Sequence, residues 1–240
     1  MSLFANLERK STVEKPTDSL GGFQTLKSDV YDAVIAMAYV SKSTGGAQFI
    51  EFEFKLPEGK THKETVYVTS GDAKGNAFTY VRNGKEFYLP GYILADEICA
   101  VTTEQLLSQQ DSDERLVEVY DFETKSKKQK EFPVLIDLIG KKLKLAIMEV
   151  KENKKEKVGG KWVETNEVRT SNVIDKAFNT EGLTTIELMD GETEAAHMEK
   201  WLDKNKGNVK DSFKEVAGST GSSSMSSGSA KPKSLFNKKD

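Results

Sequence analysis

The sequence predicts a mainly β protein with appended helices, and three observations support this fold class. Apolar and polar residues alternate over residues 50–56, which is the period of a strand with one buried and one exposed face. Turn-forming pairs such as Gly45-Gly46 and Asn83-Gly84 separate short strand-like segments. These segments follow one another as hairpins and do not alternate with long helices, which favours an antiparallel barrel or sandwich over a doubly wound sheet.

The first half of the chain predicts a hairpin sheet followed by a short helix. Residues 29–41 are apolar on both faces and rich in Val, Ile and Tyr, as is typical of a central strand, although their alanines also suit a buried helix. Residues 50–56 and 65–70 are the next two strands, joined by a Pro-Glu-Gly-Lys turn. Residues 92–101 predict a helix, after which Thr103 is expected to cap a second helical turn.

The second half of the chain predicts four more strands, at residues 115–122, 132–139, 142–147 and 161–170. The basic residues 125–130 are expected to form the loop between the first two of these strands. The polar residues 151–160 are expected to form a long loop before the last one. The whole pattern predicts a small antiparallel OB-like barrel with a short helix inserted before its later strands.

Beyond residue 175 the apolar period changes to that of a helix. Met198, Trp201 and Leu202 recur at helical spacing, and Gly207 stands where a C-terminal cap belongs. We expect this helix to pack on the barrel through the three apolar residues. The chain is thereby divided into a flexible N-terminal arm (1–19), an OB-like barrel domain (20–180), a C-terminal helical segment (181–216) and a disordered Gly/Ser linker with a basic tail (217–240).

The composition favours a soluble binding protein of a reducing compartment over an enzyme. The 240 residues carry a net charge of −3, no apolar run of membrane-spanning length and no secretory signal. Cys99 is the only cysteine, so no intramolecular disulfide can form, and we interpret it as a structural thiol. His62, expected to be solvated, and His197 lack the spacing of a metal site. No cofactor, metal or enzymatic activity is expected; a two-metal nuclease built from scattered carboxylates is the catalytic alternative.

Aromatic and basic residues gather in the stretch from residue 67 to residue 92. Exposed rings can stack on the bases of a single strand, at roughly 1–3 kcal/mol per base, while Lys and Arg neutralise its phosphates. The parity of the strand puts Tyr67 on the face opposite Val66 and Val68. The predicted nucleic-acid-binding residues are Tyr67, Lys74, Phe78, Tyr80, Arg82, Lys85, Lys142, Lys144 and Trp162. The alternative is that the aromatic residues are core and that the two lysines after residue 141 are the wet face of a strand.

The last ten residues, KPKSLFNKKD, set an apolar pair among lysines at the end of the Gly/Ser-rich segment. This pattern is typical of a short docking motif, and a solubilising tail is the alternative. The predicted partner-binding residues are Leu235, Phe236, Lys238 and Lys239. Because the segment is basic, it suits an acidic surface, for example on a polymerase, or adds a weak second contact to DNA.

The run VTSGDAKGNAFTYVRNGKEFYLPGY, the strand KKLKLAIMEVKENKKEK and the helix end KWLDKNKG occur in this order within residues 20–211. This succession resembles bacteriophage-encoded single-stranded DNA-binding proteins, most closely those of podoviruses with a virion-packaged RNA polymerase. The resemblance implies an OB-fold protein that coats single strands in phage replication and recombination in the cytoplasm of the bacterial host. In some relatives such a protein also contacts transcription machinery. The rival hypothesis is a structural or protein-interaction scaffold with no nucleic-acid role, which the acidic net charge favours.

Overall fold

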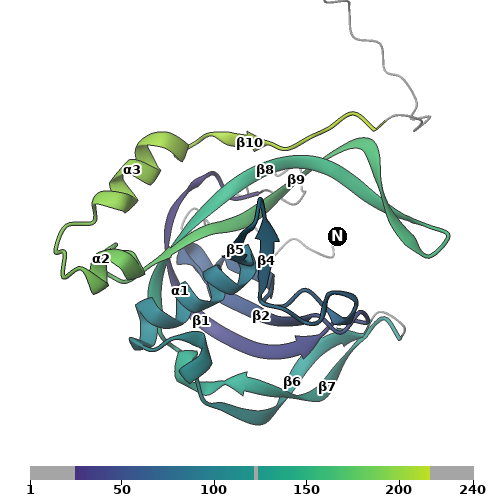
Figure 1. Cartoon of the computed structure of the whole chain (residues 1–240), viewed down its shortest axis with the longest axis horizontal. Helices are drawn as coiled ribbons and strands as arrows, with labels where there is room; N and C mark the ends of the chain where they lie inside the picture. Colours follow the sequence, from purple (N-terminus) through teal and green to yellow (C-terminus); the bar gives the residue numbers. More distant parts are fainter. Residues whose placement is uncertain (1–24, 122–123, 217–240) are drawn as a thin grey trace, which may run out of the picture.

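The computed structural model describes residues 25–121 and 124–216 of the chain. The structure is mainly β, as predicted, and nearly all of its strand pairs are antiparallel. In Figure 1 helix α1 lies in front of strands β1 and β2, and helices α2 and α3 lie together at one side. The elements in chain order are β1 (Asp29–Lys42), β2 (Gln48–Lys55), β3 (Thr61–Tyr67), β4 (Thr79–Arg82), β5 (Lys85–Tyr88), α1 (Pro90–Thr103), β6 (Ser112–Asp121), β7 (Ser126–Leu135), β8 (Lys142–Val158), β9 (Lys161–Phe178), α2 (Thr185–Met189), α3 (Ala196–Asn205) and β10 (Val209–Asp211).

Strand β1 is the central strand of the main sheet. Its residues 29–34 pair antiparallel with β8, and its residues 34–42 pair antiparallel with β2, so that one long strand serves two parts of the sheet. The alternation read from the sequence of β2 is confirmed, because Ile50, Phe52 and Phe54 are fully buried. Helix α1 packs its apolar side on this core and covers it from one face.

The strand ladders within the described residues do not close into a barrel. Strands β3 and β9 each pair with one neighbour, β2 and β8, and side chains connect β3 to β9 where backbone ladders do not. Glu64 Oε2 of β3 accepts a hydrogen bond of 2.8 Å from the backbone N–H of Ile174 in β9, and it lies 3.0 Å from His62 Nε2. An ion pair between Glu97 and Lys176 connects helix α1 to strand β9. The sheet is therefore curved, so that Glu64 of β3 reaches the backbone of β9.

The structure of strand β3 differs from two predictions, the start of the strand and the solvation of His62. It begins at Thr61, ahead of the predicted strand, because the turn before it is tight: Glu58 and Gly59 both have positive φ angles and reverse the chain at once. His62 is consequently part of the strand, and it is only 8 % exposed instead of solvated.

The predicted cap at Thr103 is wrong. The Thr103 hydroxyl donates a hydrogen bond to the Cys99 carbonyl inside the last turn of α1.

Two segments predicted as loops are strands. Residues 126–130 form the first half of β7, paired with β6, and Lys125 with its φ of +50° belongs to the turn that precedes them. Residues 151–158 continue β8, so the loop shrinks to the pair Gly159-Gly160. These segments carry almost no apolar alternation. Ion pairs between the two strands, such as Lys155 with Glu164, connect these ladders.

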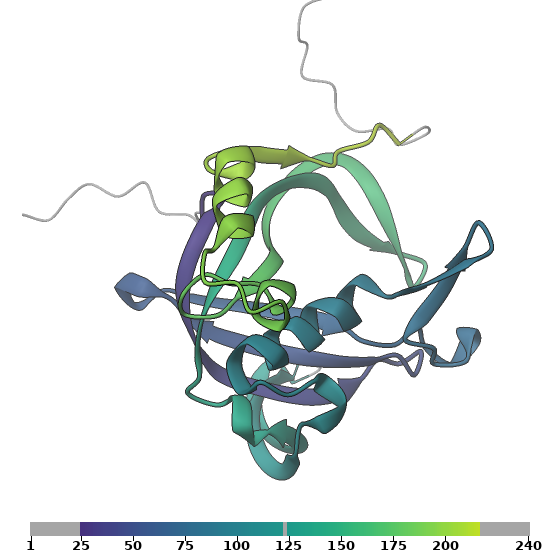
Figure 2. The same cartoon turned by 60° about the vertical axis from the view of Figure 1, so that its left-hand side comes forward.

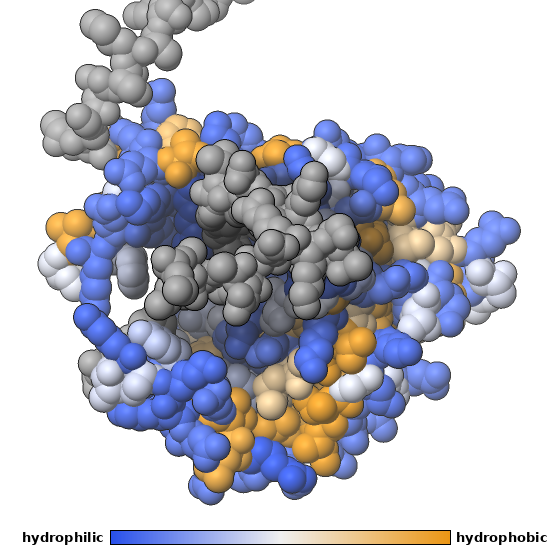
Figure 3. Space-filling model, turned by 180° about the vertical axis from the view of Figure 1, so that it is seen from behind, coloured by the Kyte–Doolittle hydropathy of each residue, from blue (hydrophilic) through white to orange (hydrophobic). Residues whose placement is uncertain are grey.

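The outer parts of β8 and β9 form a hairpin that extends beyond the sheet; residues 151–170 are called the arm below. Figure 2 shows the arm curving away from the body, and in the space-filling view from behind (Figure 3) open space separates it from the rest of the molecule. Residues 161–170 were predicted as a strand, but their pairing with residues 151–158 in a long hairpin was not predicted. Lys155 lies opposite Glu164, and Lys154 forms an ion pair with Glu167, so that ion pairs connect two strands whose side chains are mostly exposed.

Helix α3 packs on the sheet through the apolar residues predicted from its spacing. Trp201 is buried against Ala146 and Phe178, with Met198 and Leu202 beside it. The indole N–H of Trp201 donates a 2.7 Å hydrogen bond to Asp175 Oδ2, which satisfies its one polar group. Trp201 is therefore a core residue, as expected from the sequence.

After α3 the chain returns along the arm in a segment called the strap below, residues 209–216. Strand β10 pairs parallel with β8. Further along, the buried Asn153 side chain both accepts from the N–H of Lys214 and donates to its carbonyl oxygen, at 2.9 and 2.7 Å. Asn166 holds Val216 in the same way. Two side-chain amides thus fix the strap to the arm as a neighbouring strand would.

Candidate nucleic-acid interface

Strands β4 and β5 form a separate two-stranded hairpin that projects from the main sheet. The Asn83-Gly84 turn predicted from the sequence is confirmed, and both residues have positive φ angles, +53° and +72°. Such a turn matches the right-handed twist of the flanking strands and fixes their register. Tyr80 is consequently paired with Phe87, and Arg82 is paired with Lys85.

One face of this hairpin carries aromatic rings next to cations. Tyr80 and Phe87 have their ring centroids 5.8 Å apart. Arg82 and Lys85 follow on the same face, because side chains two residues apart on a strand point the same way. All four side chains are exposed. The acidic Glu86 lies on the opposite face, where it accepts a hydrogen bond from Thr79.

At the base of the hairpin three rings form a cluster. Phe78 lies 6.0 Å from Tyr88 and 5.1 Å from Tyr92, and Tyr88 lies 5.2 Å from Tyr92, measured between ring centroids. Phe78 and Tyr88 remain about half exposed. Phe78 precedes β4, Tyr88 ends β5 and Tyr92 lies in the first turn of α1. Tyr88 is stacked on each of the other two rings, whereas Phe78 and Tyr92 are tilted by 42°.

Tyr67 is joined to this cluster through the backbone. It is exposed at the end of β3, as predicted, and its ring packs on Phe49 at 5.4 Å. Gly91, in the first turn of α1, lies directly against the Tyr67 backbone: a Cβ at Gly91 would come within 2.1 Å of the Tyr67 carbonyl oxygen. Only glycine allows this approach. The start of the helix, the base of the hairpin and the end of β3 therefore meet at one place.

Lys74 lies in the loop that leads from β3 to the hairpin. Gly71 and Gly75, both at positive φ, flank its single turn, and the Ser70 hydroxyl donates to the Lys74 carbonyl oxygen. Within the described residues none of Lys74, Arg82 and Lys85 takes part in an ion pair, in contrast to most lysines of the sheet. Their charge is therefore available to an anion. We call the exposed residues Tyr67, Lys74, Phe78, Tyr80, Arg82, Lys85, Phe87 and Tyr88 the hairpin surface.

Lys142 and Lys144 are not part of the hairpin surface. Both lie on β8, and Lys142 lines a pocket with the C-terminal end of α1, whereas the hairpin leads into the N-terminal end of that helix. A helix of 14 residues spans about 20 Å. Lys144 is also neutralised by Asp32, with Nζ 2.6 Å from Oδ1. Lys142 is exposed.

Trp162 lies apart from the hairpin surface as well. It is next to the turn of the arm, opposite Lys157, and 69 % of it is exposed. A ring so exposed at the end of a projecting hairpin is available to a ligand. Leu235, Phe236, Lys238 and Lys239 lie outside the described residues.

The sequence-based site omitted Phe87 and Tyr88, although the necessary signal was present. The Asn83-Gly84 turn sets the pairing of the residues on both sides of it, and this register places Phe87 beside Tyr80. The Tyr92 ring in the first turn of α1 could not be placed without the Gly91 contact.

Features of other functional classes are few in the described part of the chain. No group of three or more His, Cys, Asp or Glu side chains there could hold a metal ion. Cys99 is buried, and burial raises the pKa of its thiol to about 12, which makes it unsuitable as a nucleophile. No helix in residues 25–121 or 124–216 is long and apolar enough to cross a membrane.

Comparison with known proteins adds no family to this description. No family model matches the chain, and no curated protein matches it at a significant level.

Proposed function

We propose that this protein is a non-catalytic, largely sequence-independent single-stranded DNA-binding protein that uses the hairpin surface. The observation that carries the proposal is that exposed aromatic rings occur on the hairpin and at its base, next to three exposed cations without ion-pair partners in the described residues. If the rings had been buried, they would have been core residues. If the cations had been paired with carboxylates, they would have been an ordinary solvated face of a sheet. The combination suits a strand whose bases stack on rings while its phosphates contact Lys and Arg.

The geometry suggests how a single strand would bind. The paired rings of Tyr80 and Phe87 offer faces to one or two bases, and Tyr67 and Tyr88 offer further faces near the base of the hairpin. Arg82 and Lys85 follow the first ring pair along the hairpin, and would meet the adjoining phosphates. Every base has a ring face, so this contact tolerates any sequence. A duplex hides those faces in its own stack and should bind poorly.

The OB-like architecture is part of the proposal. Strand β1 pairs with both β2 and β8, and a helix follows the third strand, which is the order of elements in an OB barrel. Glu64 of β3 contacts β9 at the place where such a barrel would close, and the ion pair of Glu97 with Lys176 holds helix α1 against β9. On this view the hairpin surface is an elaboration of the loop between the third strand and the helix.

The biological setting follows the resemblance of the sequence to single-stranded DNA-binding proteins of podoviruses. We propose that the chain coats single strands in phage replication and recombination in the bacterial cytoplasm, where its basic C-terminal segment recruits a polymerase or another partner. The rival function, a scaffold without a nucleic-acid role, is supported by the net charge of −3. It gives no reason for unpaired cations beside exposed rings.

Binding of the full chain to a fluorescent oligo(dT) and to a matching duplex, at two salt concentrations, tests the proposal. We expect salt-sensitive binding to the single strand alone. Tyr67→Ala and Tyr80→Ala should each weaken it, by about 5- to 150-fold if each ring stacks on one base. Tyr120→Ala is the matched control, because Tyr120 is an equally exposed tyrosine on β6. Absence of binding at low salt would favour the scaffold hypothesis. Equal losses of affinity in all three folded variants would favour it too.

A further inference from the structure

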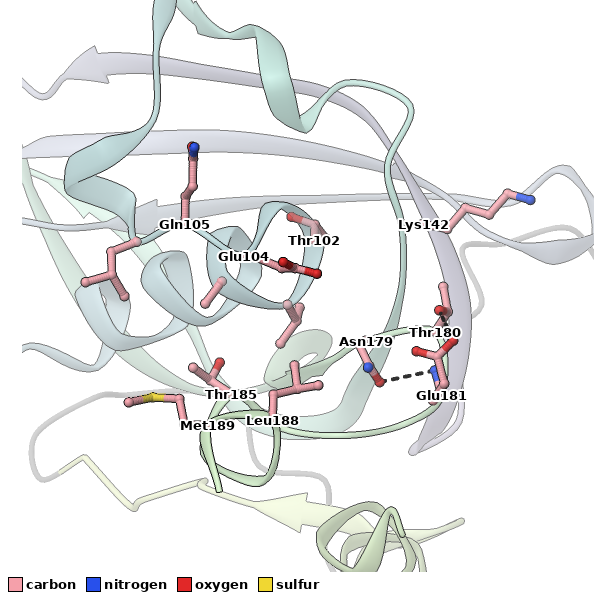
Figure 4. A pocket seen from close by; sticks show the side chains of 13 residues that line it. Thr102, Glu104, Gln105, Lys142, Asn179, Thr180, Glu181, Thr185, Leu188 and Met189 are labelled. Atoms are coloured by element: carbon pink, nitrogen blue, oxygen red, sulfur yellow. Dashed lines mark hydrogen bonds between the residues drawn. The ribbon is translucent and has the colours of Figure 1, made fainter. Parts of the chain in front are cut away.

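A second surface, far from the hairpin, exposes apolar side chains around a pocket. The pocket has a volume of about 550 Å³ and lies between α2 and the C-terminal end of α1. Its apolar lining includes Leu106, Leu188 and Met189, and Met189 is 80 % exposed. Figure 4 shows Leu188 and Met189 of α2 on one side of the pocket and Glu104 and Gln105, at the end of α1, on another side. We call this site the α2 pocket.

The exposure of α2 is built into the fold. Thr184 and Glu187 form a reciprocal capping box at the start of the helix. The Glu187 carboxylate also accepts a 2.8 Å hydrogen bond from the backbone N–H of His197, which ties α2 to the start of α3. The helix is therefore held in place although none of its five residues is buried. A fixed helix that turns large apolar side chains to solvent is typical of a contact surface.

Polar features of the α2 pocket suggest the chemistry of its ligand. Glu104 and Glu181 line it, and residues 181–194 contain five acidic residues and no Lys or Arg. In Figure 4 the Lys142 side chain points away from the other lining residues. The Thr185 hydroxyl oxygen is buried and has no hydrogen-bond partner in the described part of the chain, so a ligand with a polar backbone could satisfy it. The pocket thus fits a basic peptide with an apolar anchor.

One such peptide is present in the chain itself. Residues 231–240 carry four lysines around Leu235 and Phe236. We propose that the α2 pocket binds this C-terminal segment from a second copy of the protein, with Leu235 and Phe236 against Leu106, Leu188 and Met189, and with the lysines facing the acidic rim. The inference goes beyond DNA binding and does not depend on it.

The position of the strap favours a second copy over the same molecule. In Figure 1 the described chain ends beside the arm, on the side of the molecule away from α2. About 20 residues separate Val216 from Leu235, and a Gly/Ser-rich segment of this length spans roughly 25 Å on average. A folded body of about 190 residues is roughly 40 Å across. In its average conformation the segment therefore falls short of the far side of its own molecule, whereas the pocket of a neighbouring molecule that lies beside the tail is within its reach.

Binding of a tail to a pocket elsewhere on the next molecule is a head-to-tail contact, which leaves one tail and one pocket open at the two ends. A ten-residue peptide buries less surface than a standard protein interface, so a single contact is weak. When copies stand side by side, the effective concentration of each tail near the next pocket is high. The contact would therefore act mainly between neighbours.

A complementation experiment with full-length variants tests the proposal in the absence of DNA. Leu235→Ala/Phe236→Ala removes the anchor, and Met189→Glu places a charge in the pocket at a position too exposed to matter for folding. By sedimentation velocity the wild type should associate with rising concentration, and each variant alone should stay monomeric. A mixture of the two should form a one-to-one dimer, because one molecule keeps the pocket and the other keeps the tail. Leu116→Glu, a 62 % exposed leucine on β6, should associate like the wild type.

A labelled peptide of residues 231–240 gives the second readout. It should bind the Leu235→Ala/Phe236→Ala protein saturably, at least about tenfold more tightly than it binds the same protein carrying Met189→Glu as well. A peptide with alanine at both apolar positions should lose the same factor. Equal binding of both peptides would mean simple charge attraction and would overturn the proposal. Failure of the mixed variants to dimerise, or a wild type that stays monomeric at every concentration, would overturn it too.

Discussion

The α-carbon of Gly91 faces the carbonyl oxygen of Tyr67 so closely that no side chain fits between them. This contact joins the end of β3 to the first turn of α1, and the hairpin of β4 and β5 is the loop that starts and ends at the same junction. The exposed rings are thus held by a backbone contact at their base, while the hairpin itself has no ladder to the main sheet.

Gly91→Ala should loosen this junction. A Cβ would lie 2.1 Å from the Tyr67 carbonyl oxygen, and the backbone has to move to relieve the clash. We expect the free energy of unfolding to fall by roughly 1–3 kcal/mol, and the affinity for oligo(dT) to fall with it. Chemical denaturation and anisotropy titrations measure the two effects. Gly45→Ala is the control, because its Cβ would meet nothing closer than Ser43 Oγ at 3.9 Å. Equal stability of the two variants would contradict the role of the contact.

Replacing the cations of the hairpin should change the salt dependence of DNA binding. In Arg82→Gln/Lys85→Gln two phosphate contacts are lost, so the slope of log K against log salt should become shallower by about 1.4 for a single strand. Lys144→Gln should leave the slope unchanged, because this ammonium is paired with Asp32. Titrations at four or more salt concentrations give the slopes. If Lys144→Gln changes the slope as much as one hairpin cation does, the strand also follows β8.

The Cys99 thiol should be unreactive in the native protein. Burial raises its pKa to about 12, well above the ordinary thiol value of about 8.5, so the native state binds the thiol proton more tightly than the unfolded state between these values. This contribution to stability is therefore complete below about pH 8.5 and is lost as the pH rises towards 12. A thiol reagent at pH 8 should label the chain only after unfolding by denaturant. Rapid labelling of the folded chain would show that α1 opens readily.

The bridge between β3 and β9 should depend on Glu64. Glu64→Ala removes the acceptor of the Ile174 N–H and leaves this amide and His62 without their partner. We expect a loss of about 1–3 kcal/mol in unfolding free energy, and faster hydrogen exchange at Ile174 than at other amides of β9. Glu64→Gln, which keeps an acceptor oxygen, should recover most of the loss. Glu58→Ala, at an exposed ion pair with Lys60, should have almost no effect.

Local signals in the sequence were sufficient where one face of an element is buried. Phe52 and Phe54 alternate with charged residues because only one face of β2 meets the core, and Trp201 recurs at helical spacing for the same reason. The arm offers no such signal for its first strand, and only residues 161–170 were predicted as a strand. Both faces of the arm are largely exposed, and ion pairs such as Lys155 with Glu164 connect its two strands. Pairing of this kind becomes visible only when both strands are known.

Contacts between distant parts of the chain account for the other omissions. The approach of Gly91 to Tyr67 depends on the end of a strand that is separated from it by a whole hairpin. Asn153 and Lys214 are 61 positions apart, and nothing in either local sequence indicates their contact. The register of Tyr80 and Phe87, by contrast, follows from the Asn83-Gly84 turn, and it could have been used to include Phe87 in the predicted site.

The strap determines where the protein can be shortened. The side-chain oxygen of the buried Asn153 accepts a hydrogen bond from the N–H of Lys214, whereas its NH2 group also donates to the Thr165 carbonyl within the arm. A chain ended before residue 209 would therefore leave this oxygen without its partner. Such a deletion would damage the arm and the tail together, and its phenotype could not be assigned to either. A clean removal of the tail ends at Val216, where Asn166 still holds the last residue. Affinity tags and fluorescent fusions at the C-terminus are likewise best attached beyond that point.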